Sequence, residues 1–466
     1  MICWGDNVEL DNRKICKALI KGSNYLLKSL NYDNGVKFED ESSTTSGAWV
    51  TAESLEALLM SEVLPLASYS KIKPMIDFLV NCQNGDGSWN ILADDRLVQK
   101  PSAIATGHCT YALKLASVGG YLSSDEVKQA IDKGEYWLRS SQCCITKGGV
   151  TFWASEPVEK DIQIDCNANL GSRMEYIFSS YYAVMGLVNP EGFFVRNDVD
   201  VALLDRTVRF FKSQAEFFIG NFKSEMEQLD DISKFAKISS TICRIICALD
   251  MLSVEVPNNI TNGLNEVLLS CSKNPFMTTS IAIHTDQLKA YGTTYNNNTP
   301  FDMANALICT ESNSQIIKEI IDKYIDNQDS EGYWYLNFSS AYTIKTWSTA
   351  EALIVLNRAL KKYNEIELSE QKHRIETITR KITKQFRRIR SLAIISSLVS
   401  MVLSIFDILL IIKWISVPEN KDSFWGNLLS ILIIPLVLWI IGILWNIIKT
   451  TYNIIKNGKG DNNENE

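Results

Sequence analysis

The feature that most constrains this chain is a helix-ending turn, QNGDGSW at Gln83–Trp89, which recurs along the sequence. Glycines at such a turn can adopt a positive φ, and the tryptophan can pack back onto the helix that has just ended. Related turns return at intervals of roughly 55 to 70 residues, which is enough for two helices and a long connection. Their equivalent positions are Ser29, Gln83, Gln142, Gln214, Cys271 and Gln328.

A second helical pattern, rich in Ala, Ser, Thr and Leu, lies about half a repeat after each turn. Its copies are Trp49–Met60, Ala103–Ala116, Met174–Val188, Ile238–Leu252, Met303–Cys309 and Trp347–Leu360. Small residues let helices approach closely, as an inner layer of helices requires. Six alternating helix pairs can close into an α/α toroid, in which each pair buries its apolar face only against its neighbours. We therefore expect an all-α fold with a toroid over residues 1–364.

The pattern FLxxxQxxxGxW at Phe78–Trp89 resembles the QW motif of the superfamily of squalene–hopene cyclases and protein prenyltransferases. The copy that ends at Trp334 is similar but is one residue shorter between helix and glutamine. Through its repeats the resemblance covers about three quarters of the chain. It implies a toroid of the terpenoid cyclase type, in which the motif ties outer helices together and takes no part in chemistry.

The catalytic motifs of that superfamily are not found. Its cyclases protonate an alkene with the middle Asp of a DxDD motif, and such an acid needs an apolar cavity. Acidic pairs occur at Asp94–Asp95 and within Glu227–Asp231, but with different spacing, and no DDxxD is present for magnesium-bound diphosphate. Its protein prenyltransferases bind zinc through Asp, Cys and His, and His108, His284 and His373 do not form such a pattern. We predict no metal and no cofactor.

A ring of six inner helices leaves a central cavity that their polar side chains would line. Glu53 and Glu351 occupy matching places in the first and last copies, so they become neighbours if the ring closes. Two such glutamates can share a proton or pair with Arg173 or Arg244. Alternatively, they are acids near helix starts, stabilised by the positive end of the helix dipole. The candidate cavity residues are Trp49, Glu53, His108, Tyr111, Arg173, Glu175, Tyr181, Arg244, Asp302, Asn305, Trp347 and Glu351.

A basic stretch, residues 365–390, follows the toroid in a chain whose net charge is −8. Between Lys372 and Arg390, eight basic residues are opposed by a single acid, and isoleucines keep a rough heptad spacing. The pattern indicates an amphipathic stalk helix whose basic face contacts a membrane surface. The heptads also allow a short coiled coil, and with it a homo-oligomer, although Gln371 and Gln385 interrupt them.

Two apolar segments come next, Leu392–Ile412 and Phe424–Ile448, each long enough to cross a hydrocarbon layer of roughly 30 Å. Lys413–Ser423 between them is a short polar turn, so residues 391–449 are expected to form a two-span hairpin. Basic residues at both outer ends place the N-terminal domain and the C-terminus in the cytoplasm. Residues 450–466 are polar and are expected to be disordered.

Two residues within the expected spans stand out. Asp407 lies about five residues, or roughly 7–8 Å, from the far end of the first span. A carboxylate in hydrocarbon is costly, so Asp407 faces a partner or water, reaches the interface near Lys413, or is protonated. Pro435 removes a backbone donor from the second span and can kink it.

Composition narrows the function further. The negative net charge argues against nucleic-acid binding, and eleven scattered cysteines without a secretory signal at Met1–Asn12 favour a reducing cytosol. With scaffold repeats present and catalytic motifs missing, we expect a membrane-anchored binding or sensing module. Its toroid would hold a hydrophobic small molecule or a protein partner, and its tail would bind membrane lipid. A cytosolic recognition domain followed by a two-helix tail is similar in layout to bacterial membrane-disrupting defence effectors. The alternatives are a divergent terpene cyclase or prenyltransferase acting on an isoprenoid, and a toroid hydrolase using Glu53 and Glu351.

Overall fold

The computed structural model describes residues 11–37, 45–61, 69–93, 100–119, 124–159, 165–190, 198–227, 232–272, 299–310, 314–334 and 345–415, with 435, 438, 439, 441–443, 445, 446 and 449. These residues are mainly helical, with two small two-stranded sheets. The chain divides into two compact units, Met1–Ile366 and Glu367–Glu466.

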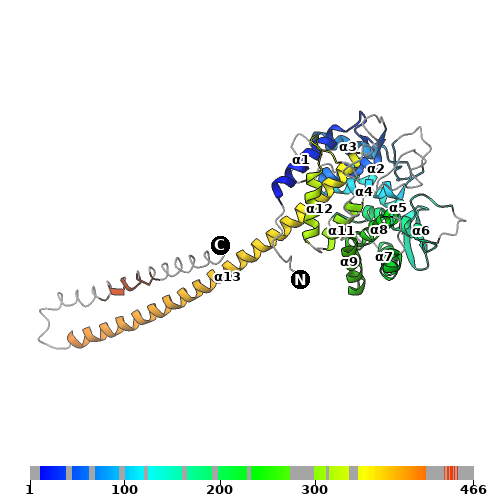
Figure 1. Cartoon of the computed structure of the whole chain (residues 1–466). Helices are drawn as coiled ribbons and strands as arrows, with labels where there is room; N and C mark the ends of the chain where they lie inside the picture. Colours follow the sequence, from blue (N-terminus) through cyan, green and yellow to red (C-terminus); the bar gives the residue numbers. More distant parts are fainter. Residues whose placement is uncertain are drawn as a thin grey trace. The chain divides into compact units, whose positions relative to one another are not determined.

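The helices of the first unit, labelled in Figure 1, form an outer and an inner set that alternate along the chain. The outer helices are α1 (Asn12–Lys28), α3 (Tyr69–Asn81), α5 (Asp125–Ser140), α7 (Asp198–Glu227), α9 (Asn258–Ser272) and α12 (Ser314–Asp326). The inner helices are α2 (Ala48–Leu59), α4 (Ala103–Val118), α6 (Leu170–Leu187), α8 (Ile232–Met251), α11 (Thr299–Thr310) and the first part of α13 (Lys345–Ile415). Helix α2 is enclosed on every side, because each residue from Ala48 to Leu58 is buried.

The inner helices pack in sequence order, and the first and last of them close the ring. Helix α2 contacts α4, α4 contacts α6, α6 contacts α8, and α8 contacts α11. The side-chain amide of Asn357 in α13 then donates to the carbonyl of Ala57 in α2, 3.1 Å away. The indole rings of Trp49 and Trp347 lie 5.2 Å apart across the same junction. The first unit is therefore a closed α/α toroid, as the repeats predict.

The closest approach within the inner layer is between α4 and α6. A Cβ on Gly107 would collide with the carbonyl group of Tyr182, and a Cβ on Gly186 would lie 2.7 Å from the Cα of Gly107. Only glycine at both positions lets the two backbones meet, because any side chain would force the helices apart.

Three buried tryptophans repeat one arrangement around the ring. In each copy the backbone N–H donates to a hydroxyl of the next inner helix, and the indole N–H donates to a carbonyl near the end of the preceding outer helix. The hydroxyl and carbonyl partners are Thr106 and Leu79 for Trp89, Ser180 and Leu138 for Trp153, and Thr349 and Tyr324 for Trp334. All three indoles are buried, so each satisfies its polar atom within the protein.

The glutamine of the motif joins neighbouring outer helices. The amide of Gln83 donates to the carbonyls of Gly87 and Ala130, each at 2.9 Å, and so ties its own turn to α5. Gly87 has φ of +93°, and a Cβ there would collide with the carbonyl of Lys133. The last copy repeats this with Gln328, Gly332 and Ala18. Gln214 differs, since its side chain bonds to Arg173 and Asn167 instead of to backbone.

The third copy departs from the expected bare turn. Strands β3 (Cys144–Lys147) and β4 (Val150–Trp153) form an antiparallel hairpin. Gly148 and Gly149, with φ of +60° and +79°, make its two-residue turn. The hairpin places Trp153 where the other copies have their tryptophan. A second small sheet pairs β1 (Val36–Lys37) with β2 (Ser46–Gly47), so the all-α expectation is corrected to a mainly helical fold.

The described part of the second unit is the remainder of α13 and a few residues of 435–449. Apolar side chains of α13 are exposed along it, among them Ile378, Val399, Val402 and Phe406. Over the residues that the structure describes, no helix is both long enough and apolar enough to span a bilayer. Most of the second expected span and all of residues 450–466 lie outside the described residues.

Candidate functional site

The inner helices bring seven buried or half-buried ionisable side chains to the middle of the ring. We call this set the central cluster; it comprises Glu53, Glu56, His108, Arg244, Asp302, Glu351 and Arg358. Its carboxylates lie on α2, α11 and α13, and none is more than 6% exposed. Helical spacing explains the grouping, because Glu53 and Glu56 are three residues apart on α2 and therefore share a face.

One half of the central cluster is a hydrogen-bonded chain through His108. The indole N–H of Trp49 donates to Nδ1 of His108 at 3.0 Å, so Nδ1 must offer a lone pair. The ring hydrogen is then on Nε2, which lies 2.8 Å from Oε2 of Glu56 and donates to it. Both ring nitrogens are thus engaged, and neither is available as a zinc ligand in this arrangement.

Arg358 completes the pairing of Glu56. Its guanidinium donates to Oε1 of Glu56 at 3.1 Å and to Oδ1 of Asn305 at 2.8 Å. Burial lowers the pKa of Arg358, but the Glu56 carboxylate and smaller contributions from neighbouring tyrosines and Cys309 together raise that pKa above its ordinary value. In this half of the cluster both carboxylate oxygens of Glu56 therefore have hydrogen-bond partners, one from His108 and one from Arg358.

The other half holds two glutamates that repel one another. Burial raises the pKa of Glu53 well above its ordinary value, with further increases from Glu56 and Asp302, while the nearby Trp347 side chain lowers it. Burial also raises the pKa of Glu351, and the carboxylate of Glu53 adds to it. Oε2 of Glu53 is buried and has no hydrogen-bond partner among the described residues. A carboxyl in this setting favours its protonated form.

Arg244 and Asp302 border the two glutamates. The guanidinium of Arg244 lies 2.8 Å from Oδ2 of Asp302 and 4.3 Å from the ring centroid of Phe178. Burial raises the pKa of Asp302, while Arg244 and Ser240 lower it. Three acids thus face one arginine on this side of the cluster, which favours retention of a proton by the glutamate pair.

Aromatic rings enclose the central cluster. Beyond its contact with Trp347, the Trp49 ring lies 6.0 Å from Tyr182, and Tyr182 lies 5.6 Å from His108. Tyr181 packs against Tyr182 at 5.1 Å. Burial raises the pKa values of both tyrosines, so their phenols stay neutral at physiological pH. The cluster is therefore a set of charged groups inside an apolar, aromatic shell.

The structure brings most of the candidate cavity residues together and separates two of them. Burial raises the pKa of Tyr111 to about 12, with a further increase from Glu56, which places Tyr111 beside the cluster. Arg173 instead donates to Oε1 of Gln214 at 2.8 Å, and Glu175 accepts from Ser155 at 3.2 Å. These two residues join the start of α6 to neighbouring elements. The residues that lie in or against the cluster are Trp49, Glu53, His108, Tyr111, Tyr181, Arg244, Asp302, Asn305, Trp347 and Glu351.

Sequence reasoning missed Glu56, Arg358 and Tyr182. Two of them carry a signal in the sequence, because Glu56 follows Glu53 by one helical turn and Arg358 follows Glu351 by two. Tyr182 adjoins a predicted residue, Tyr181, and its ring lies against Trp49 and His108. Asp94–Asp95, His284 and most of Glu227–Asp231 lie outside the described residues. Among described residues, no three acidic, cysteine or histidine side chains are grouped as metal ligands.

No protein-family model and no curated protein matches the chain. Among solved structures, it is similar to the type II terpene cyclase MstE from Scytonema, at 13% identity and a TM-score of 0.44, over 75% of this chain and 99% of that one. It is also similar to the GH76A α-1,6-mannanase from Salegentibacter sp. HEL1_6, at 9% identity and a TM-score of 0.44, over 74% and 98% of the two chains. These are different kinds of enzyme, and such distant likenesses assign no activity to this chain.

Proposed function

We propose that this protein is a binding or sensing module whose toroid is held at a membrane by its C-terminal segments. The observation that carries the proposal is the exposed apolar surface of α13. Met401, Val402 and Leu403 are 62%, 64% and 58% exposed. Successive residues point about 100° apart around a helix, so three in a row cover most of its circumference. Water cannot stabilise such a surface, whereas lipid chains can.

The apolar surface extends well beyond these three residues. Ile395, Val399, Phe406 and Leu410 are also about half exposed or more. Soluble proteins rarely leave so large a contiguous apolar surface uncovered. Leu392–Ile412 is therefore proposed as the first membrane span and Phe424–Ile448 as its partner, with membrane lipid as the ligand of both.

A basic stretch of α13 precedes the apolar one. Lys372, Arg380, Lys381 and Lys384 are exposed on it. Lysines and arginines next to a span favour the cytoplasmic side and bind anionic lipid headgroups. On this proposal the toroid and the C-terminus are both cytoplasmic.

Binding, not turnover, is the role that we assign to the toroid. In the central cluster, the polar atoms of Glu56, His108 and Arg358 bond to one another or to neighbouring side chains. Such a network fixes the inner helices in one arrangement, as a scaffold for recognition requires. A hydrophobic small molecule or a protein partner is proposed as the ligand.

Alkaline carbonate extraction of membranes that contain the full-length chain tests the membrane attachment. The unaltered chain should stay in the membrane pellet. The double substitution Val402→Asp and Phe406→Asp should release it, since each carboxylate near a bilayer centre costs about 2.5–3.5 kcal/mol. Ile20→Asp, at an exposed apolar position of α1, is the matched control and should leave the chain in the pellet. Release of the unaltered chain would contradict the proposal.

A second candidate is an acid-catalysed reaction of an isoprenoid, favoured by the state of Glu53. Glu53 is buried, its pKa is raised, and one of its oxygens has no hydrogen-bond partner among the described residues. Such an acid near the rings of Trp49 and Trp347 could protonate an alkene, and the carbocation, facing aromatic rings, would then lose a proton to give the product. Incubation with squalene and with geranylgeraniol, followed by mass spectrometry, tests this. A cyclised product that Glu53→Gln abolishes would establish it. A hydrolase using Glu53 and Glu351 would instead release sugar from an oligosaccharide, and the same variant would abolish that release.

A further inference from the structure

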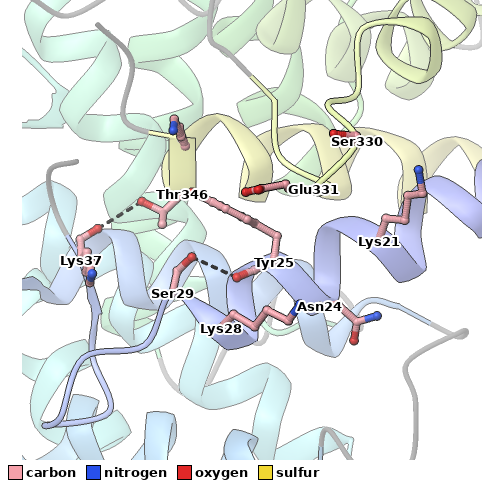
Figure 2. A pocket seen from close by; sticks show the side chains of 10 residues that line it. Lys21, Asn24, Tyr25, Lys28, Ser29, Lys37, Ser330, Glu331 and Thr346 are labelled. Carbon is pink, nitrogen blue, oxygen red and sulfur yellow. Dashed lines mark hydrogen bonds between the residues drawn. The ribbon is translucent and has the colours of Figure 1, made fainter. Parts of the chain in front are cut away.

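A pocket of about 640 Å³ lies where the first and last copies of the repeat meet. Helix α1 forms one wall, with Lys21, Asn24, Tyr25 and Lys28 along it (Figure 2). The turn that carries Ser330 and Glu331 faces this wall, and Lys37 and the start of α13 complete the lining. We call it the seam pocket. Its volume is that of a site for a small organic molecule.

The walls of the seam pocket are held in place by the repeat itself. The amide of Gln328 donates to the carbonyl of Ala18 at 2.9 Å and fixes the turn to α1. Gly332, with φ of +102°, lets that turn approach the backbone of Lys21. On the other side the hydroxyl of Thr346 donates to the carbonyl of Lys37 at 3.1 Å. The pocket is therefore a formed feature of the closed ring.

The junction between the turn after α3 and helix α5 corresponds to the seam, and comparing the two shows how the seam differs. The glutamines Gln83 and Gln328 donate to Ala130 and Ala18, and by this register Trp137 and Asp86 correspond to Tyr25 and Glu331. The indole of Trp137 donates to Oδ2 of Asp86 at 3.1 Å, which bridges that junction. At the seam, a smaller tyrosine replaces the tryptophan, and its ring packs on Tyr333 at 5.1 Å. The space beside it is the seam pocket.

Charge identifies the class of ligand. The pocket is lined by four lysines, Lys21, Lys28, Lys37 and Lys345, and by one acid, Glu331. The ammonium of Lys345 lies 4.6 Å from the ring of Tyr333. Lys21 and Lys28 have no carboxylate partner among the described residues. In a chain of net charge −8, this is a local excess of positive charge.

We propose that the seam pocket binds a small soluble oligophosphate, a molecule with at least two phosphate groups. A single phosphate offers one anionic group, whereas an oligophosphate offers Lys21 and Lys28 an anionic group each. The site goes beyond the membrane-attached role, because it lies wholly within the toroid and does not depend on the tail.

The test is calorimetric titration of the full-length chain, in detergent micelles, with inorganic tripolyphosphate. The double variant Lys21→Gln and Lys28→Gln should bind at least about tenfold more weakly, since two charge-assisted hydrogen bonds are lost. The matched control, Lys128→Gln and Lys133→Gln on α5, removes the same charge from exposed positions of an equivalent helix and should stay within about twofold. Circular dichroism of each variant checks its fold.

Three outcomes would overturn the proposal. The first is no binding of tripolyphosphate by the unaltered chain below about 1 mM. The second is equal weakening in the pocket variant and in the α5 control, which would indicate general charge attraction. The third is binding confined to a short-chain phosphoinositide, titrated in parallel, which would assign the lysines to a lipid headgroup. Loss of membrane attachment in the carbonate assay affects none of these readouts, so the two proposals fail independently.

Discussion

The side-chain amide of Gln328 donates a hydrogen bond to the carbonyl of Ala18, 2.9 Å away and 310 residues earlier in the chain. The same amide donates to the carbonyl of Gly332 at 3.0 Å. One side chain thus ties α12 and its turn to α1, and so joins the two ends of the toroid. On α1, the partner in this bond is the backbone carbonyl of residue 18, which any residue type at that position would supply.

Gln328→Ala should therefore destabilise the toroid. Two carbonyls lose their donor, and each lost bond costs about 1 kcal/mol, so the free energy of unfolding should fall by about 2 kcal/mol. Gln315→Ala on α12 is the control, because Gln315 is exposed and its side-chain amide bonds to Glu319 on the same helix. Urea unfolding followed by circular dichroism measures both. Equal effects of the two substitutions would show that the closure bond has no special role.

Gly107→Ala should be among the most damaging small substitutions. Its methyl group would collide with the carbonyl of Tyr182 at the crossing of α4 and α6, and overpacking of this kind costs about 1–3 kcal/mol. Gly220→Ala in α7 is the contrasting substitution, because a Cβ at that position has no atom within 4 Å of it. It should stabilise the chain by about 0.5–1 kcal/mol through helix propensity. If the midpoint temperature of thermal unfolding shifted in the same direction for both substitutions, the close crossing of α4 and α6 would be contradicted.

The repeats explain why much of this fold can be predicted from the sequence. Matching positions in the first and last copies are sufficient to predict that Glu53 and Glu351 face one another in a closed ring. Trp153, the tryptophan of the third copy, is not predictable in this way. The β3–β4 hairpin separates Gln142 from Trp153 by more residues than separate Gln83 from Trp89. A fixed spacing overlooks it.

The rest of the central cluster depends on tertiary contacts. An arginine such as Arg358 on α13 could equally have pointed to solvent, and only its pairing with Glu56 decides the direction. Arg173 illustrates the opposite case: it lies on an inner helix but turns outward to Gln214 and packs over Phe217, 3.8 Å from its ring. Helical period alone does not distinguish the two arginines.

Glu56→Gln should destabilise the chain strongly. It leaves the half-buried guanidinium of Arg358 without its carboxylate, and breaking a buried pair by removing one partner costs about 3–5 kcal/mol. Asp77→Asn is the control, since its pair with Lys73 is exposed and contributes at most about 1 kcal/mol. The comparison is made by urea unfolding at neutral pH. A loss of less than about 1 kcal/mol in Glu56→Gln would contradict the ion-pair assignment.

Glu53 and Glu351 should make the stability of the toroid fall as pH rises. Their pKa values are raised in the folded state, so the folded chain keeps protons that the unfolded chain releases near pH 4.5. Above that pH the unfolded state binds fewer protons, and the free energy of unfolding declines until the folded pKa is passed. Glu53→Gln, which mimics the protonated acid, should flatten this decline above pH 4.5. An unchanged slope in the variant would contradict the proton-sharing pair.

The most direct test of the membrane-held toroid is photolabelling from within a bilayer. The unaltered full-length chain is reconstituted in vesicles containing a photoactivatable probe on the lipid chains, and labelled peptides are identified after trypsin digestion. Cleavage at Arg390 and Lys413 isolates the first proposed span as Ser391–Lys413. We predict that label concentrates in that peptide and in Asp422–Lys449, with little in residues 11–366. Label spread across toroid peptides, or absent from Ser391–Lys413, would contradict the account.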